Sequence, residues 1–452
     1  MNFEKLALQL PTILLPKAGV DLNRWAVIAC DQYTSEPEYW QEVDRLAAER
    51  PSTLRLVFPE VYLEEAGGDA RIADINACMN KYLADDVLVA CEQGFILVDR
   101  KTSHAPSRKG LVVALDLEAY DYRPGSKTMI RTTEGTIVDR LPPRIRVREN
   151  AAVELPHIMV LIDDPEQTVI EPLFEADLKQ AYDFELMQNG GHLRGWNVTQ
   201  QKLLDQIGAA LERLAEKDRF QQRYEVDDDE VMLYAMGDGN HSFATAKAIW
   251  ETLKAEASDP DAGVSDYADI MDHPARYALV ELVNVHDPGL EFEAIHRVLF
   301  DVDPDDLFRK AGEYYRQEGT PCRIEWYDDL ATANAVAEAS DVAHAIPFVA
   351  AGRFSLLRID NPALTLEVAT LQNFLDDYLQ SRPEARIDYI HGKEAVTRLG
   401  GQKGNVGFYL PSISKHDLFR TIVRDGALPR KTFSMGEADE KRFYLEARRI
   451  TR

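Results

Sequence analysis

The segment 230–250 reads EVMLYAMGDGNHSFATAKAIW, an apolar run followed by a polar turn and a helical pattern. Residues 231–236 predict a buried strand that ends at glycines. A helix is expected to begin near His241, because apolar residues then recur at helical spacing, at Ala246, Ile249, Trp250 and Leu253. The segment therefore predicts a strand, a tight turn and a helix that packs one face on a core.

The turn GDGNHS (237–242) gathers several kinds of chemically useful group. Its glycines permit a tight turn, which directs side chains and backbone N–H groups beyond the strand end: Asp238, Asn240, His241 and Ser242. Such a place suits an anion, especially phosphate. Helix capping explains any one of these residues, but a helix needs one cap, and Thr245 and Lys247 follow in the first turns. We therefore interpret the whole turn as a functional site.

Composition bounds the class of protein. The chain has 452 residues, of which 45% are hydrophobic, enough for two or three globular domains. Its 51 Lys and Arg residues against 77 Asp and Glu give a net charge of −26, which repels a nucleic-acid backbone. We expect a small-molecule partner and no nucleic acid. A homo-oligomer is compatible with the sequence, which does not specify the oligomeric state.

The cysteines and the hydropathy pattern indicate the compartment. Cys30, Cys78, Cys91 and Cys322 lie far apart and form no C-x-x-C pair, which favours a reducing cytosol and argues against a zinc ribbon. No signal peptide fits the N-terminus, and no apolar run is long enough to suggest a membrane span. The expected location is therefore cytoplasmic, without a membrane partner.

The predicted elements interleave strands and helices without strict alternation, so the expected fold class is mixed α/β. Strands are expected at 25–30, 157–162 and 277–285, a hairpin over 95–117, and helices over 70–93, 199–219, 305–318 and 366–380. A second hairpin is expected to turn near Gly352, and a loop lies at 259–266. We divide the chain into a main domain, 1–300, and a C-terminal lobe, 301–452.

The segment RTTEGTIVDR (131–140) is a second candidate constellation. Its pattern fits a polar edge strand and a site equally well. As a site, it offers Glu134 as a general base or metal ligand. Arg131 and Arg140 are its cations for phosphate, and Thr136 and Asp139 are polar binding groups.

Weaker candidates lie elsewhere in the chain. GGHLRGW (190–196) reads as a glycine-rich loop that carries His192 and Arg194, although it is not a Walker A sequence. Asp31 and Tyr33 follow a predicted strand, and sites of α/β proteins collect at strand ends. Most other histidines, His157 among them, lack paired metal-ligand spacing and are interpreted as ordinary polar or packing residues.

The turn and its surroundings resemble a known family. GDGNHSFATAK resembles the signature of the domain of unknown function 1015 family, whose commoner form, DGHHR, is also similar to a motif of free serine kinases with a ParB/sulfiredoxin-like fold. The likeness spans nearly the whole chain, because 25–40, 130–150, 155–165, 185–196 and 428–450 look familial too. Asn240 stands at the first His and Ser242 at the Arg, so this chain lacks a bidentate phosphate donor there.

The resemblance implies a fold, an activity and further ligands. It implies a ParB/sulfiredoxin-like core with a C-terminal lobe, and a phosphotransferase that acts between ADP or ATP and serine or phosphoserine with Mg²⁺. In one direction such an enzyme converts phosphoserine and ADP to serine and ATP. It also favours a site at 131–140, and it marks His296, Arg297 and Lys431 as binding residues.

Two other classes stay open. A nucleotide-binding regulator of ParB-like fold would bind without turnover, and the lost arginine favours it. A ParB-like DNA-binding protein is disfavoured by the acidity of the chain.

Phosphoryl transfer requires cationic donors, a carboxylate-held metal and a base for the hydroxyl. We assign Asp238 to the metal or the hydroxyl and Glu134 to the base or metal, with His241 orienting the turn. Glu134 is therefore expected close to the turn. Lys247 is expected to reach back along its helix and replace the missing arginine.

Overall fold

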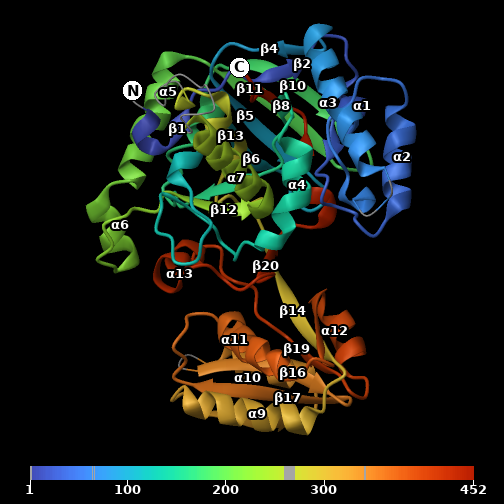
Figure 1. Ribbon diagram of the computed structural model, residues 1–452. Coiled ribbons are helices and arrows are strands. Elements are labelled where there is room, and N and C mark those ends of the chain that lie inside the picture. The colour runs from blue at the N-terminus through green and yellow to red at the C-terminus, as the bar shows by residue number, and fades with distance from the viewer. Residues whose placement is uncertain (1–2, 64, 66, 259–269, 341–342) are drawn as a thin grey trace. The chain divides into compact units, whose positions relative to one another are not determined.

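The computed structural model describes residues 3–63, 65, 67–258, 270–340 and 343–452 (Figure 1). The loop expected at 259–266 lies outside these residues. The chain forms two compact units, one made of residues 1–291 with 436–452 and the other of 292–435. This division differs from the expected one, because residues 292–300 belong to the second unit and 436–452 return to the first.

The first unit is built on a mixed sheet with the order β10-β11-β5-β6-β13-β9-β12-β7, and β1 also pairs with β6. The pairs β12–β7 and β13–β9 are parallel, and the other neighbours are antiparallel. The strands are β1 (Leu8–Gln9), β5 (Phe95–Lys101), β6 (Arg108–Asp116), β7 (Ile130–Arg131), β9 (Met159–Ile162), β10 (Lys179–Glu185), β11 (His192–Val198), β12 (Tyr234–Asp238) and β13 (Tyr277–Asn284).

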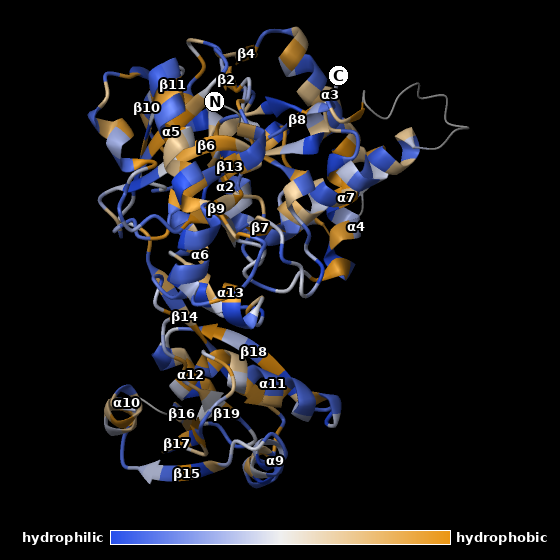
Figure 2. Ribbon diagram, turned by 90° about the vertical axis from the view of Figure 1, so that its left-hand side faces the viewer, coloured by the Kyte–Doolittle hydropathy of each residue, from blue (hydrophilic) through white to orange (hydrophobic). Residues whose placement is uncertain are grey.

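Both faces of this sheet are buried, because successive side chains of a strand point to opposite faces. Leu111 and Val113 of β6 join the core cluster that contains Phe243 and Trp250, whereas Val112 joins the cluster that contains Trp40. The helices of the unit are α1 (Leu22–Trp25), α2 (Pro37–Ala47), α3 (Gly68–Ala84), α4 (Leu141–Arg148), α5 (Gln201–Leu214), α6 (Lys217–Tyr224) and α7 (Asn240–Ala257). Figure 2 shows apolar and polar residues alternating along these helices, as one-sided burial requires.

Residues 437–450, here called the C-terminal strap, complete the first unit. Within the strap, β21 (Phe443–Tyr444) pairs with β3 (Val27–Ile28), and β22 (Arg448–Arg449) pairs with β8 (Val153–Glu154). A further short pair joins β2 (Leu14–Pro16) to β4 (Leu88–Ala90). The strap therefore crosses segments that come from much earlier in the chain.

Buried ion pairs hold the strap on the sheet. Arg442 Nε donates to Glu281 Oε2 of β13 at 2.7 Å, and its Nη2 donates to Glu446 Oε2 at 2.7 Å. These three residues are at most 5% exposed. Burial alone would raise the pKa of Glu281, but the guanidinium of Arg442 holds it below its usual value. The pair is therefore ionised, and removal of either partner would leave a buried charge.

Strap carbonyls are also fixed by arginines of the sheet. Arg100 of β5 donates to the carbonyls of Asp439 at 2.9 Å and Lys441 at 3.0 Å, and Arg108 of β6 donates to the carbonyl of Glu440 at 3.0 Å. The backbone around Lys441 is thus held on both sides of the residue.

The second unit is a smaller α/β unit with the sheet order β15-β17-β16-β19-β14-β18, in which β20 also pairs with β14. Its neighbours are antiparallel, and α9 and α11 cover a core that contains Phe348 and Phe408. The elements are β14 (Phe292–Phe300), α9 (Pro304–Gln317), β15 (Cys322–Tyr327), α10 (Leu330–Glu338), β16 (Ala343–Ala350), β17 (Arg353–Asp360), α11 (Glu367–Gln380), β18 (Arg386–His391), α12 (Lys393–Gly400), β19 (Val406–Phe408), α13 (Leu418–Asp425) and β20 (Phe433–Met435).

The mixed α/β class is confirmed, and several local expectations are corrected. The helix expected over 70–93 ends at Ala84 and is followed by β4. The segment 190–196 is mostly strand β11 and not a glycine-rich loop, since only the residues before His192 form its turn. The segment 131–140 contributes only Arg131 to a strand and then leaves the sheet edge. Among the described residues, none of the helices is long and apolar enough to cross a membrane.

The strap network gives a stability prediction. Arg442→Met should lower the free energy of unfolding by about 3–5 kcal/mol, because it leaves Glu281 and Glu446 buried without their cation. Urea denaturation followed by circular dichroism measures the change. Arg45→Met is the control: it removes an exposed ion pair with Glu42 on α2 and should change stability little. Equal effects of the two substitutions would show that the buried network does not hold the strap.

Candidate functional site

The turn between β12 and α7 has the expected form. β12 ends at Asp238, Gly239 follows with a φ of 80°, and α7 begins at Asn240. A Cβ at Gly239 would lie 3.0 Å from Ile158 Cγ1 and 3.1 Å from its Cα. Glycine is therefore required both for the left-handed backbone and for the close approach to the neighbouring segment.

The start of α7 has no side-chain cap. Its N-cap residue, Gly239, has no side chain that could accept hydrogen bonds from the N–H groups of the first turn. These groups carry the partial positive charge of an 18-residue helix. An anion that reaches the turn would be stabilised by them.

Asp238 is paired with a residue of the strap. Lys441 Nζ donates to Asp238 Oδ2 at 3.0 Å, and the backbone N–H of Gly239 donates to Asp238 Oδ1 at 2.8 Å. The side chain of Lys441 is 13% exposed and that of Asp238 is 30% exposed. Burial raises the pKa of Asp238, but Lys441 outweighs it and the net shift is downward. Asp238 is therefore a carboxylate at neutral pH, with a cation beside it at the mouth of the turn.

The loop that follows β7 lies against the same turn. β7 runs parallel to β12, with Ile130 opposite Tyr234. Thr132 Oγ1 donates to Asn240 Oδ1 at 2.8 Å, and the backbone N–H of Ile137 donates to His241 Nε2 at 3.4 Å. The backbone that carries Glu134 is thus beside the turn, flanked by residues that contact Asn240 and His241.

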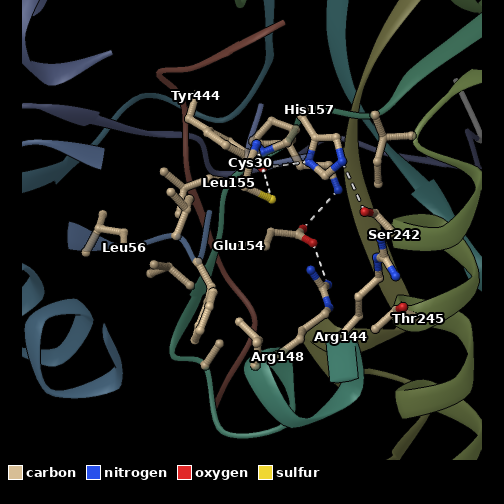
Figure 3. Close-up of a pocket in the computed structure, with 18 of the residues that line it drawn as sticks. Cys30, Leu56, Arg144, Arg148, Glu154, Leu155, His157, Ser242, Thr245 and Tyr444 are labelled. Atoms are coloured by element: carbon tan, nitrogen blue, oxygen red, sulfur yellow. Dashed lines mark hydrogen bonds and ion pairs between the residues drawn. The ribbon is translucent and has the colours of Figure 1, made fainter. Parts of the chain in front are cut away.

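Ser242 belongs to a chain of hydrogen bonds that joins four segments. Its Oγ lies 3.0 Å from His157 Nε2, and His157 Nδ1 lies 2.9 Å from the Tyr444 hydroxyl. That hydroxyl donates to Cys30 Sγ at 3.1 Å. Figure 3 shows these side chains in a row along the wall of a pocket.

The pocket has a volume of about 140 Å³ and a mixed lining. Its apolar residues come from the segment after α2, from α3 and from the segment before β9, and they include Leu56, Phe58, Met79 and Leu155. Ser242 and Thr245 of α7 line the side where the hydrogen-bonded chain lies (Figure 3). The pocket therefore adjoins the start of α7 and suits a small ligand with an apolar part.

Two ion pairs contribute charge to this pocket. Arg144 of α4 donates to Glu60 at 2.5 Å, and Arg148 donates to Glu154 at 2.6 Å. Burial raises the pKa of Glu60 despite the opposing charge of Arg144. Burial also acts on Glu154, but Arg448 and Arg148 hold its pKa below the usual value. Arg144 is thus a half-buried cation on α4, a helix that packs against α7.

Two expected phosphate ligands are directed elsewhere. Lys247 forms an ion pair with Glu251 at 2.5 Å, one turn further along α7, so its ammonium does not lie at the helix start. Arg131 is 5% exposed and donates to the carbonyls of Thr128 at 3.1 Å and Glu230 at 2.8 Å. A carboxylate one turn along the same helix therefore holds the ammonium of Lys247, and two backbone carbonyls hold the guanidinium of Arg131.

The other candidates near 131–140 and after β3 are more exposed or occupied by local contacts. Asp139 and Arg140 are exposed in the turn before α4, and Arg140 supplies a carbonyl to Arg144. Thr136 lies in the loop beside the turn. Asp31 accepts from Gln32 at 3.0 Å, and Tyr33 stacks on Tyr39 with ring centroids 3.9 Å apart.

His192 and Arg194 lie on β11, well separated from β12 in the sheet order. His192 contacts Asp183 at 2.6 Å and Glu185 at 2.7 Å, and Arg194 pairs with Asp99. Burial lowers the pKa of His192, but its two carboxylate partners raise it overall. Neither residue is brought to the turn.

His296, Arg297 and Lys431 belong to the second unit. Burial lowers the pKa of His296 to about 4, and its Nδ1 accepts from the backbone N–H of Leu410 at 3.0 Å. Arg297 is fully buried and donates to the carbonyls of Ile295 at 2.6 Å and Lys431 at 2.9 Å. Within the second unit, the side chains of His296 and Arg297 therefore bind backbone groups, and Lys431 contributes a backbone carbonyl.

The expected metal ligands do not form a ready metal site. Asp238 has one oxygen on Lys441 and the other on a backbone N–H. In the part of the chain that the structure describes, no group of three or more His, Cys, Asp and Glu side chains could hold a metal ion. A cation at Asp238 would have to displace Lys441, so the residues present do not fit a resident magnesium ion.

Several site residues were missed from the sequence: Lys441, His157, Tyr444, Cys30, Glu60 and Arg144. His157 was interpreted as a packing residue because it has no metal-ligand spacing. A signal was nevertheless present, since His157, Lys441 and Tyr444 fall inside the segments 155–165 and 428–450, which carry the family resemblance.

The chain is similar to several solved structures, at low sequence identity. No curated protein matched the sequence. Solved structures with a similar arrangement include a free serine kinase in complex with AMP (10% identity, TM-score 0.40, 78% of this chain and 94% of that chain covered) and a conserved hypothetical protein from Pyrococcus furiosus (13%, 0.36, 75% and 95%). SbnI from Staphylococcus aureus, with a C-terminal truncation, is also similar (10%, 0.34, 72% and 82%).

The family described as "Protein of unknown function (DUF1015)" matches residues 14–378, which is most of the chain and includes the turn and the pocket residues up to Leu279. The strap lies beyond the matched range. The chain belongs to the DUF1015 family.

Proposed function

We propose that this protein is a small-molecule phosphotransferase, which moves a phosphoryl group between a nucleotide and a small hydroxyl compound. Serine and phosphoserine are the proposed acceptor and donor, with ATP or ADP as the nucleotide. The choice of serine follows the resemblance of the GDGNHS turn to the DGHHR motif of free serine kinases.

One observation carries the proposal. The N-terminus of α7 has no side-chain cap. The ammonium of Lys441 pairs with Asp238, which directly precedes the N-cap residue Gly239. A phosphate there would receive backbone N–H groups, the positive end of a helix and an ammonium group together. Positioning and charge stabilisation of this kind are what phosphoryl transfer chiefly requires.

Asp238 has two roles in this proposal. It holds Lys441 at the mouth of the turn, and as a carboxylate it can accept a hydrogen bond from the acceptor hydroxyl. Glu134 is the proposed base for that hydroxyl, because its loop adjoins the turn through Thr132 and Ile137. His241 orients that loop, and Asn240 fixes Thr132.

Lys441 and Arg144 are the proposed cations that bind phosphate, in place of Lys247 and Arg131. Lys441 thus supplies the cation that the missing arginine at position 242 would have supplied, although as a point charge and not as a planar fork. Magnesium ions that accompany nucleotides are bound largely by phosphate oxygens and water. Because Asp238 is already occupied by Lys441, no step is assigned to a metal ion.

The proposal is tested by ligand binding followed by turnover. ATP or ADP should raise the apparent melting temperature, since ligands that bind only the folded state stabilise it. Serine with ATP, or phosphoserine with ADP, should then give product detectable by mass spectrometry. Nucleotide binding without turnover of either pair would overturn the enzyme assignment in favour of a nucleotide-binding regulator.

Asp238→Asn tests the turn as the catalytic centre. The substitution keeps the shape of the side chain and removes its charge, so kcat/KM should fall by roughly 100-fold or more while the fold is retained. Initial rates and circular dichroism measure the two quantities. Asp183→Asn, a partly exposed carboxylate on β10, is the control and should keep its rate. Near wild-type turnover of Asp238→Asn would exclude the turn as the centre.

Lys441→Met and Lys247→Met form a matched pair of lysine substitutions. If Lys441 meets phosphate directly, its loss should weaken nucleotide binding by more than roughly tenfold, or about 1.4 kcal/mol. Lys247→Met should change binding little, because the ammonium of Lys247 is held at Glu251, further along α7 and away from the turn. Isothermal titration calorimetry checks both. A larger effect at Lys247 than at Lys441 would reverse the assignment.

A further inference from the structure

Ser242 is placed as an activated hydroxyl. It is the third residue of α7, where its Oγ faces the pocket and lies 3.0 Å from His157 Nε2 (Figure 3). The other ring nitrogen of His157 lies 2.9 Å from the Tyr444 hydroxyl. A hydroxyl nucleophile, a histidine and a third group that orients the histidine are the parts of an activated serine.

The partners of Tyr444 set the tautomer of His157. The Tyr444 oxygen accepts from the backbone N–H of Cys30 at 3.2 Å, and its single proton is donated to Cys30 Sγ at 3.1 Å. With the Tyr444 proton on Cys30 Sγ, His157 Nδ1 is the donor toward the Tyr444 oxygen. His157 Nε2 is left without a proton and accepts from Ser242 Oγ–H. This tautomer is the one that a general base requires.

The protons at the far end of the chain are retained at neutral pH. Burial raises the pKa of Tyr444, and it raises that of the Cys30 thiol too. Neither group therefore becomes a competing anion beside His157.

The position of Ser242 also suits the product of its reaction. A phosphoryl group on its Oγ would lie in the first turn of α7, where negative charge is stabilised by the helix. The uncapped Gly239 leaves the N–H groups of that turn without a competing side-chain acceptor from the N-cap.

We propose that Ser242 accepts the phosphoryl group from the nucleotide and carries it as a covalent phosphoserine before transfer to the acceptor. The inference rests on the proposed phosphotransferase function and adds a two-step route to it. In the first step, Ser242 Oγ forms a bond to the γ-phosphorus of ATP, and the bond from that phosphorus to the bridging oxygen of ADP breaks. The Oγ proton passes to His157 Nε2, and ADP leaves.

The second step returns the enzyme to its starting state. The acceptor oxygen bonds to the phosphorus of the phosphoserine while the Ser242 Oγ–P bond breaks, and His157 gives its proton back to Oγ. The proton of the acceptor hydroxyl passes to the proposed base, Glu134, and then to water. No oxidant, reductant or other co-reactant enters either step.

The experiment uses the full chain with ATP and without acceptor. Intact-protein and peptide mass spectrometry should show one added phosphoryl group on Ser242, and the enzyme should exchange label between ADP and ATP. Ser242→Ala should lose both signals. Thr252→Ala, which removes an exposed hydroxyl further along α7, should keep both.

His157 needs a readout that a structural role would not move. His157→Gln should slow phosphorylation of Ser242 by roughly 100-fold while nucleotide affinity stays unchanged. Loss of nucleotide affinity together with the rate would indicate that the histidine only supports the fold, and would overturn its role. Circular dichroism confirms that the variant is folded.

A fluorophosphonate probe separates this inference from the proposed function, because it needs no nucleotide. Ser242 Oγ should bond to its phosphorus with loss of fluoride, in the wild type and not in Ser242→Ala. Turnover of serine and ATP by Ser242→Ala at the wild-type rate would overturn the covalent route and leave the phosphotransferase standing. Absence of nucleotide turnover together with absence of probe labelling would overturn both.

Discussion

The first unit depends on charges buried under the C-terminal strap. Arg442 lies between Glu281 of the sheet and Glu446 of the strap, and removal of one member would leave the others charged in a place that excludes water. Such a network tolerates one register only, because each guanidinium N–H has a fixed direction. That register sets Lys441 against Asp238 and Tyr444 against His157. The precision of the site therefore originates in the electrostatics of a segment that contributes little regular structure.

The positive charge of the site comes from two kinds of group, rigid backbone dipoles and flexible side chains. The N-terminus of α7 supplies backbone dipoles that cannot rotate away, whereas Lys441 and Arg144 are long side chains already neutralised by Asp238 and Glu60. An incoming anion would therefore compete with those carboxylates for the two cations. A protein of net charge −26 can in this way keep a local group of positive charges.

The sequence pattern predicted those parts of the fold that depend on contacts between neighbours in the sequence. The strand, turn and helix around Gly239 follow from residues that are neighbours in sequence, as does the hairpin of β5 and β6. The partners of the turn could not be predicted this way, because Lys441 is 203 residues from Asp238 and Tyr444 is 287 residues from His157. The ion pair of Lys247 was missed for the opposite reason, because its partner Glu251 is a nearer carboxylate on the same helix. The glycines before His192 belong to a strand connection and do not form a phosphate loop.

The order of the units along the chain has a consequence for biosynthesis. Residues 292–435 form a unit of their own, and the chain returns to the first unit only afterwards. A ribosome therefore completes the whole second unit before it makes the residues that finish the pocket. Until then the carboxylate of Glu281 lacks Arg442, and nascent chains carry an unfinished centre. The pocket, which Tyr444 lines, is therefore complete only after the second unit has been synthesised.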